Sequence, residues 1–211
     1  MKKSERIYLF RIIHIDNLDF ILNSQQITCP NHVKKDINYI GIGDTSLIRN
    51  RNSKAIKISP YGTFVDYVAF YFCSRPPMLY NIQNGYMNVE KRKPEDIIYL
   101  VTTFEQIKKH NCEYIFTDGH AYHNYSQFFN HEKDLMEIDW QAVKLKQWAD
   151  TEEDPDRKRR KQAEFLIYQE LPLLALVGII VYNEAAQKVV SSKLMAHNLS
   201  YKIHISSNYY Y

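Results

Sequence analysis

The sequence predicts an α+β fold, and three observations carry that prediction. Segments rich in β-branched and aromatic residues are interspersed with segments of helical periodicity, but they do not form regular βαβ units. Neither GxGxxG nor GxxxxGK[ST] occurs, which disfavours a doubly wound nucleotide-binding fold. With 211 residues, 45% of them hydrophobic, the chain is long enough for one domain with a substantial core and short for two. We therefore expect residues 1–211 to form a single domain.

The amino-terminal part predicts a strand followed by a short helix. Residues 7–15 favour a strand because β-branched and aromatic side chains occupy both of its faces. Leu18, Ile21 and Leu22 then repeat at helical spacing, which predicts an amphipathic helix ending near residues 23–24. We expect Asp16 or Asn17 to cap the start of this helix by accepting from its free amide hydrogens.

The remaining elements follow from the same reasoning. Residues 28–60 lack periodicity and carry Pro30, Gly41 and Gly43, which predicts a long functional loop with one short helix. Further expected elements are strands at 67–71, 97–102 and 114–117, a helix at about 103–109, one or two helices at 135–149, an exposed linker or helix start at 152–161, a strand at 179–182, a helix at 184–196 and a strand at 201–205.

Composition and cysteine count exclude several classes of protein. Charged residues make up 24% of the chain, which is ordinary for a globular domain and argues against disorder. The longest apolar run, residues 171–182, is interrupted by Pro172 and Gly178 and is too short to cross a bilayer, so we expect a soluble, cytoplasmic protein without membrane contact. Three cysteines without CxxC spacing, and scattered histidines without an HExxH pattern, indicate no disulfide framework and no metal site.

Charge and aromatic content indicate a phosphate-bearing ligand. The net charge is only +3, but basic residues cluster at 49–54, at 91–93 and at 157–161, a pattern that a solvated helix face also produces. The chain contains 17 tyrosines and 10 phenylalanines, many in polar contexts such as residues 122–125. Aromatic rings beside cationic and amide side chains suit stacking on exposed bases.

Glu164 is the most informative single carboxylate. It follows the basic run directly and begins an apolar segment, where a charge is costly unless it is paired or used. The residues alone leave a second interpretation open, in which Glu164 is only a helix-start carboxylate.

Four segments together resemble one protein family. They are residues 10–18 (FRIIHIDNL), 66–79 (DYVAFYFCSRPPML), 116–120 (FTDGH) and 162–166 (QAEFL), and they span nearly the whole chain. In this order and at this spacing they are similar to the DarT family of DNA ADP-ribosyltransferases. The resemblance implies an ADP-ribosyltransferase fold, in which a split, mostly antiparallel sheet with flanking helices holds NAD.

The resemblance also implies an activity and its partners. Members of this family transfer ADP-ribose from NAD, without a metal, to a base of single-stranded DNA, commonly thymine. They are toxins paired with a DarG antitoxin, whose macrodomain removes the modification. We therefore expect single-stranded DNA and a DarG-type antitoxin as partners of this chain.

The catalytic residues of the family map to two positions. The glutamate of the family's QAE motif is Glu164, which would hold the ribose hydroxyls and stabilise positive charge on the ribose as nicotinamide leaves. The family's loop arginine falls at Arg51, with Arg49 as the near alternative. Since an arginine is a poor base, we expect it to contact NAD and to favour the anion of the target base electrostatically.

The first strand matches the family's NAD-anchoring strand. The implied NAD contacts are main-chain groups of Ile12 and Ile13, a side chain of Arg11 or His14, and Asn17 at the following helix start. Which of Arg11 and His14 reaches the ribose stays open at this point.

The central strand supplies a further NAD contact. Tyr71 stands at the tyrosine of the family's FYF motif, where its ring could stack on nicotinamide or serve only as a core aromatic. The resemblance also places an NAD-covering element at about residues 34–52.

The DNA contacts are expected in a substrate-reading loop at about residues 120–164, which assigns His120 and Tyr122 to the substrate, and at Arg75. The family often has Arg-Ser-Pro where this chain has Arg75, Pro76 and Pro77. Pro76 lacks a hydroxyl and an amide donor, which affects the choice of base more than the chemistry.

Two alternatives to a thymine-directed enzyme remain. The same fold and glutamate could serve transfer to guanine or to RNA. In a second alternative the chain is a non-catalytic single-strand binding module, with its aromatic residues as stacking platforms and residues 157–161 as a phosphate track.

Overall fold

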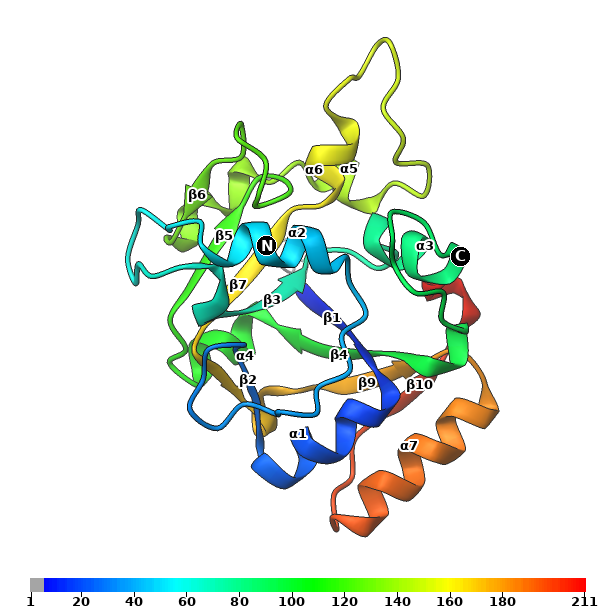
Figure 1. Ribbon diagram of the computed structural model, residues 1–211. Coiled ribbons are helices and arrows are strands. Elements are labelled where there is room, and N and C mark those ends of the chain that lie inside the picture. Colours follow the sequence, from blue (N-terminus) through cyan, green and yellow to red (C-terminus); the bar gives the residue numbers. More distant parts are fainter. Residues whose placement is uncertain (1–5) are drawn as a thin grey trace, which may run out of the picture.

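The computed structural model describes residues 6–211, including the backbone but not the side chains of Leu47, Arg51 and Asn52. Its centre is an eight-stranded sheet in the order β10-β9-β4-β1-β3-β7-β5-β6, in which only the β10–β9 pair is parallel (Figure 1). Its strands are β1 (Tyr8–His14), β3 (Tyr67–Tyr71), β4 (Ile97–Thr103), β5 (Tyr114–Thr117), β6 (Phe128–Phe129), β7 (Glu164–Tyr168), β9 (Gly178–Val181) and β10 (Ile203–Ile205). β2 (Gln26–Thr28) and β8 (Glu170–Pro172) form a separate pair. The expected mostly antiparallel sheet is confirmed.

The sheet is split between its two central strands. β1 is in register with β4 over its whole length, from the pair Tyr8–Thr103 to the pair His14–Ile97. With β3 it shares only the pair Phe10–Tyr71. Beyond that pair the two strands separate, as the resemblance implied.

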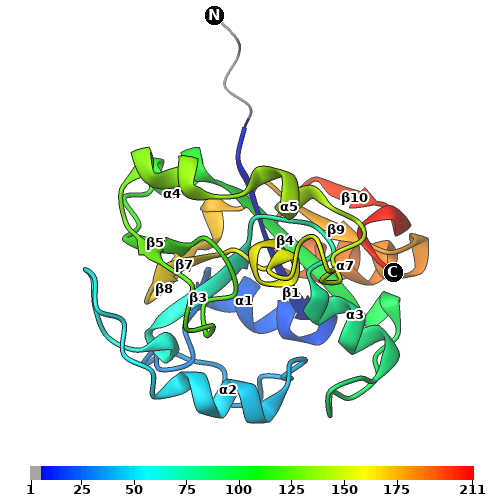
Figure 2. The ribbon, with the colours of Figure 1, turned by 90° about the horizontal axis from the view of Figure 1, so that it is seen from above.

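Helices cover both faces of the sheet. Seen from above, α2 (Thr45–Asn52) and α3 (Pro77–Asn84) lie on one side, and α4 (Phe104–Lys109) and α5 (Trp140–Lys144) on the other (Figure 2). α1 (Leu18–Ser24) packs beside α7 (Glu184–Ala196), with an ion pair between Asp19 and Lys193. The short helix α6 (Arg157–Lys161) leads into β7. Within the described residues, none of the helices combines the length and apolar character needed to cross a bilayer.

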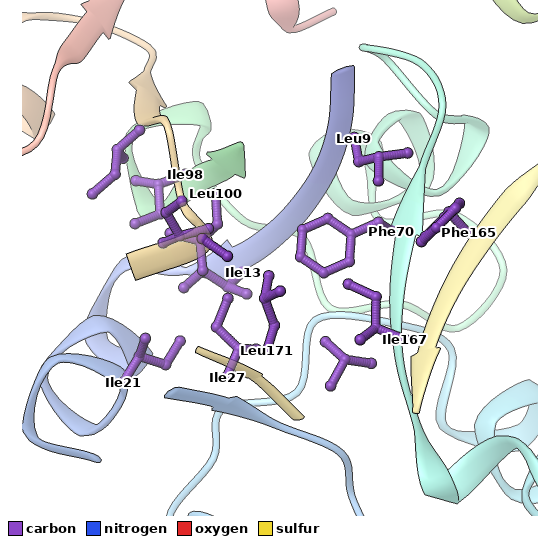
Figure 3. Packing of buried hydrophobic residues seen from close by; sticks show 14 of the residues in the cluster. Leu9, Ile13, Ile21, Ile27, Phe70, Ile98, Leu100, Phe165, Ile167 and Leu171 are labelled. Carbon is purple, nitrogen blue, oxygen red and sulfur yellow. The ribbon is translucent and has the colours of Figure 1, made fainter. Parts of the chain in front are cut away.

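The core determines where a site can lie. On the α4/α5 face the sheet buries one continuous cluster, which includes Leu9, Phe70 and Phe165 (Figure 3). On the α2/α3 face the buried residues form two separate clusters, one around Tyr99 and one around Leu166. β1 and β4 contribute to the cluster around Tyr99, and β7 contributes to the cluster around Leu166. The split in the sheet therefore lies between these two clusters. On the α2/α3 face the gap between these two clusters therefore lets polar groups reach the centre of the sheet.

Several expectations needed correction. Asn17 precedes α1 but makes no side-chain cap bond, because its amide is bonded elsewhere, and it is the His14 ring that accepts from the backbone N–H of Asp16. The one or two helices expected at 135–149 correspond to the five-residue helix α5, which follows a 3₁₀ segment (Glu132–Glu137). The pair β2–β8 and helix α3 were not expected. For α3 the signal was Pro77 at the first helical turn, where a missing N–H costs nothing.

Candidate active site

Glu164 stands at the end of the sheet where the split begins. It is the first residue of β7 and is paired with Tyr71 of β3, which is itself paired with Phe10 of β1. Directly opposed residues of neighbouring strands point to the same side of a sheet. These three side chains therefore form a row on the α2/α3 face. Glu164 is only 1% exposed, so the charge of its carboxylate must be stabilised by specific partners.

The loop after β5 supplies one such partner. The Glu164 carboxylate oxygen Oε1 accepts a hydrogen bond of 3.0 Å from the backbone N–H of Ala121. The Glu164 N–H donates to the Thr117 hydroxyl at 3.3 Å, and that hydroxyl donates to the carbonyl of Gly119 at 2.6 Å. A backbone N–H aimed at an ionised carboxylate is a strong hydrogen bond and lowers the cost of burying it. The carboxylate and the loop therefore hold each other in place.

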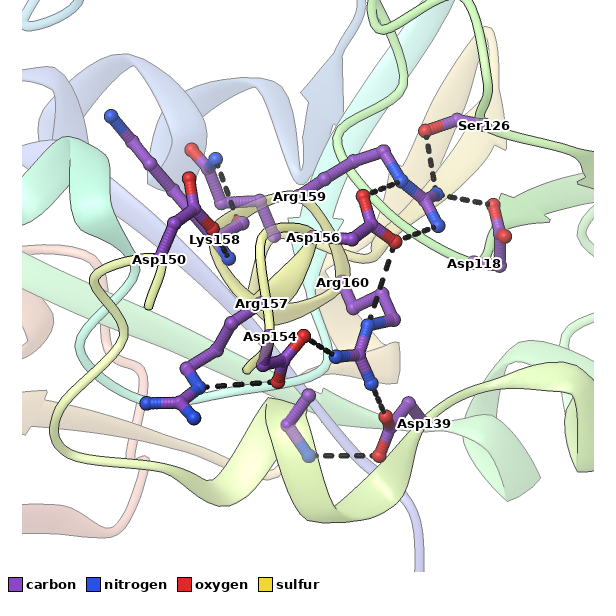
Figure 4. Close-up of polar contacts among 12 residues, drawn as sticks. Asp118, Ser126, Asp139, Asp150, Asp154, Asp156, Arg157, Lys158, Arg159 and Arg160 are labelled. Carbon is purple, nitrogen blue, oxygen red and sulfur yellow. Dashed lines mark hydrogen bonds and ion pairs between the residues drawn. The ribbon is translucent and has the colours of Figure 1, made fainter. Parts of the chain in front are cut away.

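Arg159 of α6 clamps this loop from outside (Figure 4). Its guanidinium donates to both carboxylate oxygens of Asp156, at 2.7 and 2.8 Å, and at 3.1 Å to both Asp118 and Ser126. The hydrogen bond from Arg159 holds the pKa of Asp156 below its usual range. A Cβ atom on Gly119 would lie 2.4 Å from Arg159 Nη1 and 2.9 Å from its carbonyl oxygen, so only glycine fits there.

Carboxylates neutralise the three arginines of the basic run at residues 157–161. Arg160 pairs with Asp139 and Asp154, and Arg157 pairs with Asp154 at 3.2 Å (Figure 4). Lys161 is 2% exposed. Of the two structures expected for residues 152–161, an exposed linker or a helix start, a helix is present at Arg157–Lys161.

The split between β1 and β3 exposes main-chain groups. Beyond Phe10, the described part of the chain gives β1 no strand partner on its β3 side, so its N–H and C=O groups are open to an amide such as that of nicotinamide. The side chains of Ile12 and Ile13 are buried, at 4% and 0% exposure, which leaves only main-chain groups for a ligand. Because the N–H of Phe104 donates to the carbonyl of Ile7, the odd-numbered residues of β1 bond to β4, so the N–H and C=O of Ile12 face the split and those of Ile13 face Ile98. Within residues 6–211, no group of three or more His, Cys, Asp or Glu side chains could hold a metal ion.

Strand alternation separates Arg11 from His14. His14 is an even-numbered residue of β1, like Phe10, and so shares the face of Tyr71 and Glu164. Its Nδ1 accepts from the Asp16 N–H at 3.3 Å, which in the neutral ring leaves Nε2 as the donor. Arg11 projects toward the other face, and its Nη1 donates at 2.8 Å to the carbonyl of Ala69 across the split.

Asn17 holds the covering segment rather than offering a free amide. Its Nδ2 donates to the carbonyl of Ile40 at 2.9 Å, and its Oδ1 accepts from the Ile40 N–H at 2.8 Å. Asn17 is 2% exposed, and α1 behind it has only seven residues. The structure therefore places Asn17 as an anchor of the loop that precedes α2.

Helix α2 reaches the row of site residues through α3. The Tyr71 hydroxyl contacts the Met78 sulfur at 3.7 Å, and a Cβ on Gly43 would lie 3.5 Å from the same sulfur. α2 begins two residues after Gly43 and carries both candidate arginines. Arg49 is exposed, whereas the side chain of Arg51 lies outside the described residues.

The loop after β5 gathers aromatic side chains near Glu164. Lys54 donates to the carbonyl of Tyr122 at 2.9 Å and lies 5.0 Å from the centre of its ring, which joins this loop to the segment after α2. The rings of His123 and Tyr125 are 5.4 Å apart, and Tyr125 is 80% exposed. His120 is half-buried, and its N–H donates to the carbonyl of Arg159. His120 and Tyr122 are thus brought to the side of Glu164 that faces α2.

Arg75 is not part of this group. Its Nε donates at 2.7 Å to the carbonyl of Asn208, and its own carbonyl accepts from the Tyr211 hydroxyl. It thus lies beside the carboxyl-terminal segment, whereas His120 and Tyr122 lie in the loop between β5 and β6.

Comparison with known proteins identifies the family. Residues 10–211 match a family described as "ssDNA thymidine ADP-ribosyltransferase, DarT". The chain belongs to the DarT family. It is 33% identical over 207 residues to a DNA ADP-ribosyl transferase of Escherichia coli O127:H6, covering 98% of this chain and 94% of that protein. A Thermus sp. 2.9 DNA ADP-ribosyl transferase is 34% identical over 179 residues, covering 83% and 81%.

Solved structures agree with this assignment. Thermus sp. 2.9 DarT in complex with ADP-ribosylated ssDNA superposes with a TM-score of 0.90 at 30% identity, covering 97% of this chain and 96% of that chain. The same DarT in complex with NAD+ gives a TM-score of 0.86 at 29% identity, covering 99% of each. The predicted fold, the DNA ADP-ribosyltransferase activity and NAD as co-substrate are thereby confirmed for this DarT family member.

Sequence reasoning missed the groups that hold the site together. Thr117, Ala121 and Arg159 were not among the expected site residues, nor was the exposed Tyr125. The signal for the clamp was present as Asp118 in one segment and Arg159 in another, but 41 residues separate them.

Proposed function

We propose that this DarT family member transfers ADP-ribose from NAD to thymine in single-stranded DNA, with Glu164 as the catalytic carboxylate. The supporting observation is the buried Glu164 side chain, placed beside Tyr71 where the split between β1 and β3 opens. A charge buried this deeply would be a liability in a binding module that performs no chemistry.

The row of residues along the split suits NAD. The open main chain at Ile12 would bind the nicotinamide amide, and the Tyr71 ring would stack on nicotinamide. We assign the ribose contact to His14 rather than Arg11, because His14 shares the face of Glu164 and presents Nε2 as a donor. Arg11 instead bridges the split.

The reaction needs a cation to be stabilised and an anion to be favoured. As the bond between ribose C1′ and nicotinamide breaks, positive charge grows on the ribose, and the Glu164 carboxylate stabilises it. The electron pair of the broken bond leaves with neutral nicotinamide. Thymine N3 forms the new bond to C1′, and the N3 proton is lost to solvent. A guanidinium on α2, Arg51 by alignment, favours the N3 anion electrostatically.

The loop after β5 would read the acceptor strand. Tyr122 and His120 lie next to the carboxylate, and the exposed Tyr125 offers a further ring for stacking. Arg75 would then meet the strand on the other flank of the site, beside the carboxyl-terminal segment.

The biological setting is part of this proposal. A Thermosipho africanus relative, 25% identical over 163 residues, is a DNA ADP-ribosyl transferase-DNA ADP-ribosyl glycohydrolase fusion protein. We propose that residues 1–211 act as one catalytic domain in the cytoplasm, as a toxin opposed by a DarG-type macrodomain antitoxin. Expression of the chain should then arrest growth, and co-expression of a macrodomain glycohydrolase should restore it.

A mass-spectrometric assay tests the activity and the acceptor. The protein is incubated with NAD and single-stranded oligonucleotides whose only reactive base is thymine or guanine, and with an RNA of matched sequence. We expect an ADP-ribose adduct on thymine DNA alone. Adducts confined to guanine or RNA would move the acceptor, and the absence of any adduct together with the absence of nicotinamide release would refute the proposal.

The two arginines of α2 form a matched pair for the same assay. Arg51→Ala should abolish the adduct, whereas Arg49→Ala should at most weaken binding and reduce its salt dependence. The reverse ranking would move the assignment to Arg49. Equal, mild effects would mean that α2 only covers NAD.

A further inference from the structure

A cavity lies at the end of the sheet, on the side of α5. Its volume is about 580 Å³, and it is bounded by β1, the segment after β3, α5 and the carboxyl-terminal segment. Aromatic rings form much of its wall, contributed by Tyr8, Phe72, Trp140 and Tyr209. Phe72 and Trp140 are held edge to face at 5.4 Å, so part of this wall is fixed. A cavity of this size and lining suits a nucleobase with its sugar.

Among the described residues, the charged side chains that line the cavity are all cationic. Its described lining includes five cationic side chains and no carboxylate; the cations are Arg6, Arg75, Lys144, Lys146 and Lys161. An aromatic wall with a cationic rim is the chemistry of single-stranded nucleic acid recognition, in which bases stack and phosphates are neutralised.

Lys161 places a buried ammonium group in the wall of the cavity. The residue is 2% exposed, and its Nζ donates to the carbonyls of Val143 at 2.6 Å and Ser74 at 3.5 Å. In the described part of the chain no carboxylate lies within ion-pair distance of it, and burial lowers its pKa. A buried ammonium without a counter-ion is unfavourable, and an anion bound in the cavity would offset that cost.

The cavity is close to the site of transfer along the chain. The wall residues Phe72, Cys73, Ser74 and Arg75 directly follow Tyr71, and Lys161 precedes Glu164 by three residues. At about 3.3 Å per extended residue, Arg75 lies within about 13 Å of Tyr71. A single strand of DNA whose acceptor base lies at Glu164 can therefore reach the cavity within a few nucleotides, by passing over the end of the sheet.

We propose that this cavity is a subsite for the single-stranded DNA substrate, which holds a nucleotide flanking the acceptor thymine. The flanking base stacks in the aromatic wall, and its phosphate is bound by Lys146 and Arg75 at the rim above Lys161. This assignment rests on the proposed function for the identity of the strand. It predicts that affinity for DNA depends on nucleotides on one side of the acceptor.

The test compares oligonucleotides of decreasing length in wild-type protein and two single-charge variants. Lys146→Glu reverses an exposed rim charge of the cavity, and Lys188→Glu reverses an exposed charge on α7, outside the lining. Oligonucleotides with one thymine are trimmed stepwise from either end, and KM for DNA and for NAD are measured. Wild type and Lys188→Glu should lose affinity when one particular end is trimmed.

Lys146→Glu should show that loss already with the full-length oligonucleotide. We expect its KM for DNA to rise about tenfold, and the slope of log KM against log salt concentration to fall by about 0.7. Trimming the oligonucleotide should not raise this KM further. KM for NAD and kcat at saturating DNA should be unchanged. Arg6→Glu, on another wall of the cavity, should behave like Lys146→Glu.

Three results would overturn the subsite. One is equal behaviour of Lys146→Glu and Lys188→Glu, and another is a wild-type KM that does not depend on length. The third combines two measurements: calorimetry shows that thymidine monophosphate binds the wild type but not Lys146→Glu, and trimming the oligonucleotide leaves KM for DNA unchanged. The cavity would then be a site for a free nucleotide. If wild type modifies no oligonucleotide, the proposed function fails by itself. Calorimetric binding of the long and trimmed oligonucleotides then still decides on the cavity.

Discussion

Replacing Glu164 by glutamine and by alanine separates two effects of its carboxylate. The carboxylate accepts from the buried N–H of Ala121, which holds the loop after β5, and it carries the negative charge proposed to stabilise the ribose cation. Glutamine keeps an acceptor oxygen and removes the charge. Alanine removes both.

The expected magnitudes follow from these contacts. Loss of one preorganised electrostatic contact to a transition state costs about 10²–10³ in kcat, so both variants should be inactive to that degree. Alanine also leaves the Ala121 N–H buried without its partner, which costs about 1–3 kcal/mol. For a chain of this size 1 kcal/mol shifts Tm by about 2–4 °C, so Glu164→Ala should melt about 2–12 °C below wild type. Glu164→Gln should melt at or above the wild-type temperature, because no charge remains to be buried.

Single-turnover transfer and thermal melting measure the two effects independently. Glu170→Gln is the matched control, since Glu170 is a neighbouring glutamate on β8 whose side chain is 42% exposed and paired with His32 at 3.1 Å. It should change neither rate nor Tm by more than a small amount. A Glu164→Gln protein that melts normally and retains more than about a tenth of the wild-type rate would refute the catalytic role.

Three further predictions concern the framework of the site. Asn17→Ala removes both bonds to Ile40 and should expose the preceding loop to trypsin and raise KM for NAD, with kcat less affected. Gly119→Ala forces a Cβ against Arg159 and should lower stability by about 1–3 kcal/mol in urea unfolding. Because bonding to Arg159 lowers the folded pKa of Asp156, its stabilisation is complete above the ordinary value of 3.8 and is lost as pH falls below it. In the Asp156→Asn variant, the midpoint of urea unfolding should therefore fall less steeply than in wild type as the pH is lowered below about 4.

Local pattern was sufficient for most of the elements. β3, β5 and α7 coincide with the segments expected at 67–71, 114–117 and 184–196, because each has a clear period and a turn or cap at its ends. α7, for example, begins after Asn183, whose side chain accepts from the Ala186 N–H. Elements without period, such as the three-residue strands β2 and β8, exist only through their pairing with each other and left no local signal.

The site was predictable in part. The cost of a charge in an apolar segment singled out Glu164, and the resemblance gave it a catalytic role. The structure shows why that residue must be specially supported, since it is buried at the start of β7. The choice between Arg11 and His14 could not be made before the register was known. Alternation along β1, counted from the pair Phe10–Tyr71, places His14 on the face of Glu164 and Arg11 on the other.

The basic run shows what charge patterning alone cannot decide. From sequence, residues 157–161 fit a nucleic-acid surface because their charges stand together. In the fold, Arg159 and Arg160 are bound by carboxylates from three separate segments, at 118, 139 and 154–156, which no local window brings together. Among the described residues Lys158 and Lys161 have no carboxylate partner, and of these two Lys158 is exposed and Lys161 is buried. We therefore expect this run to contribute to nucleic-acid binding through Lys161, which lines the cavity. Arg159 instead holds the loop that contacts Glu164.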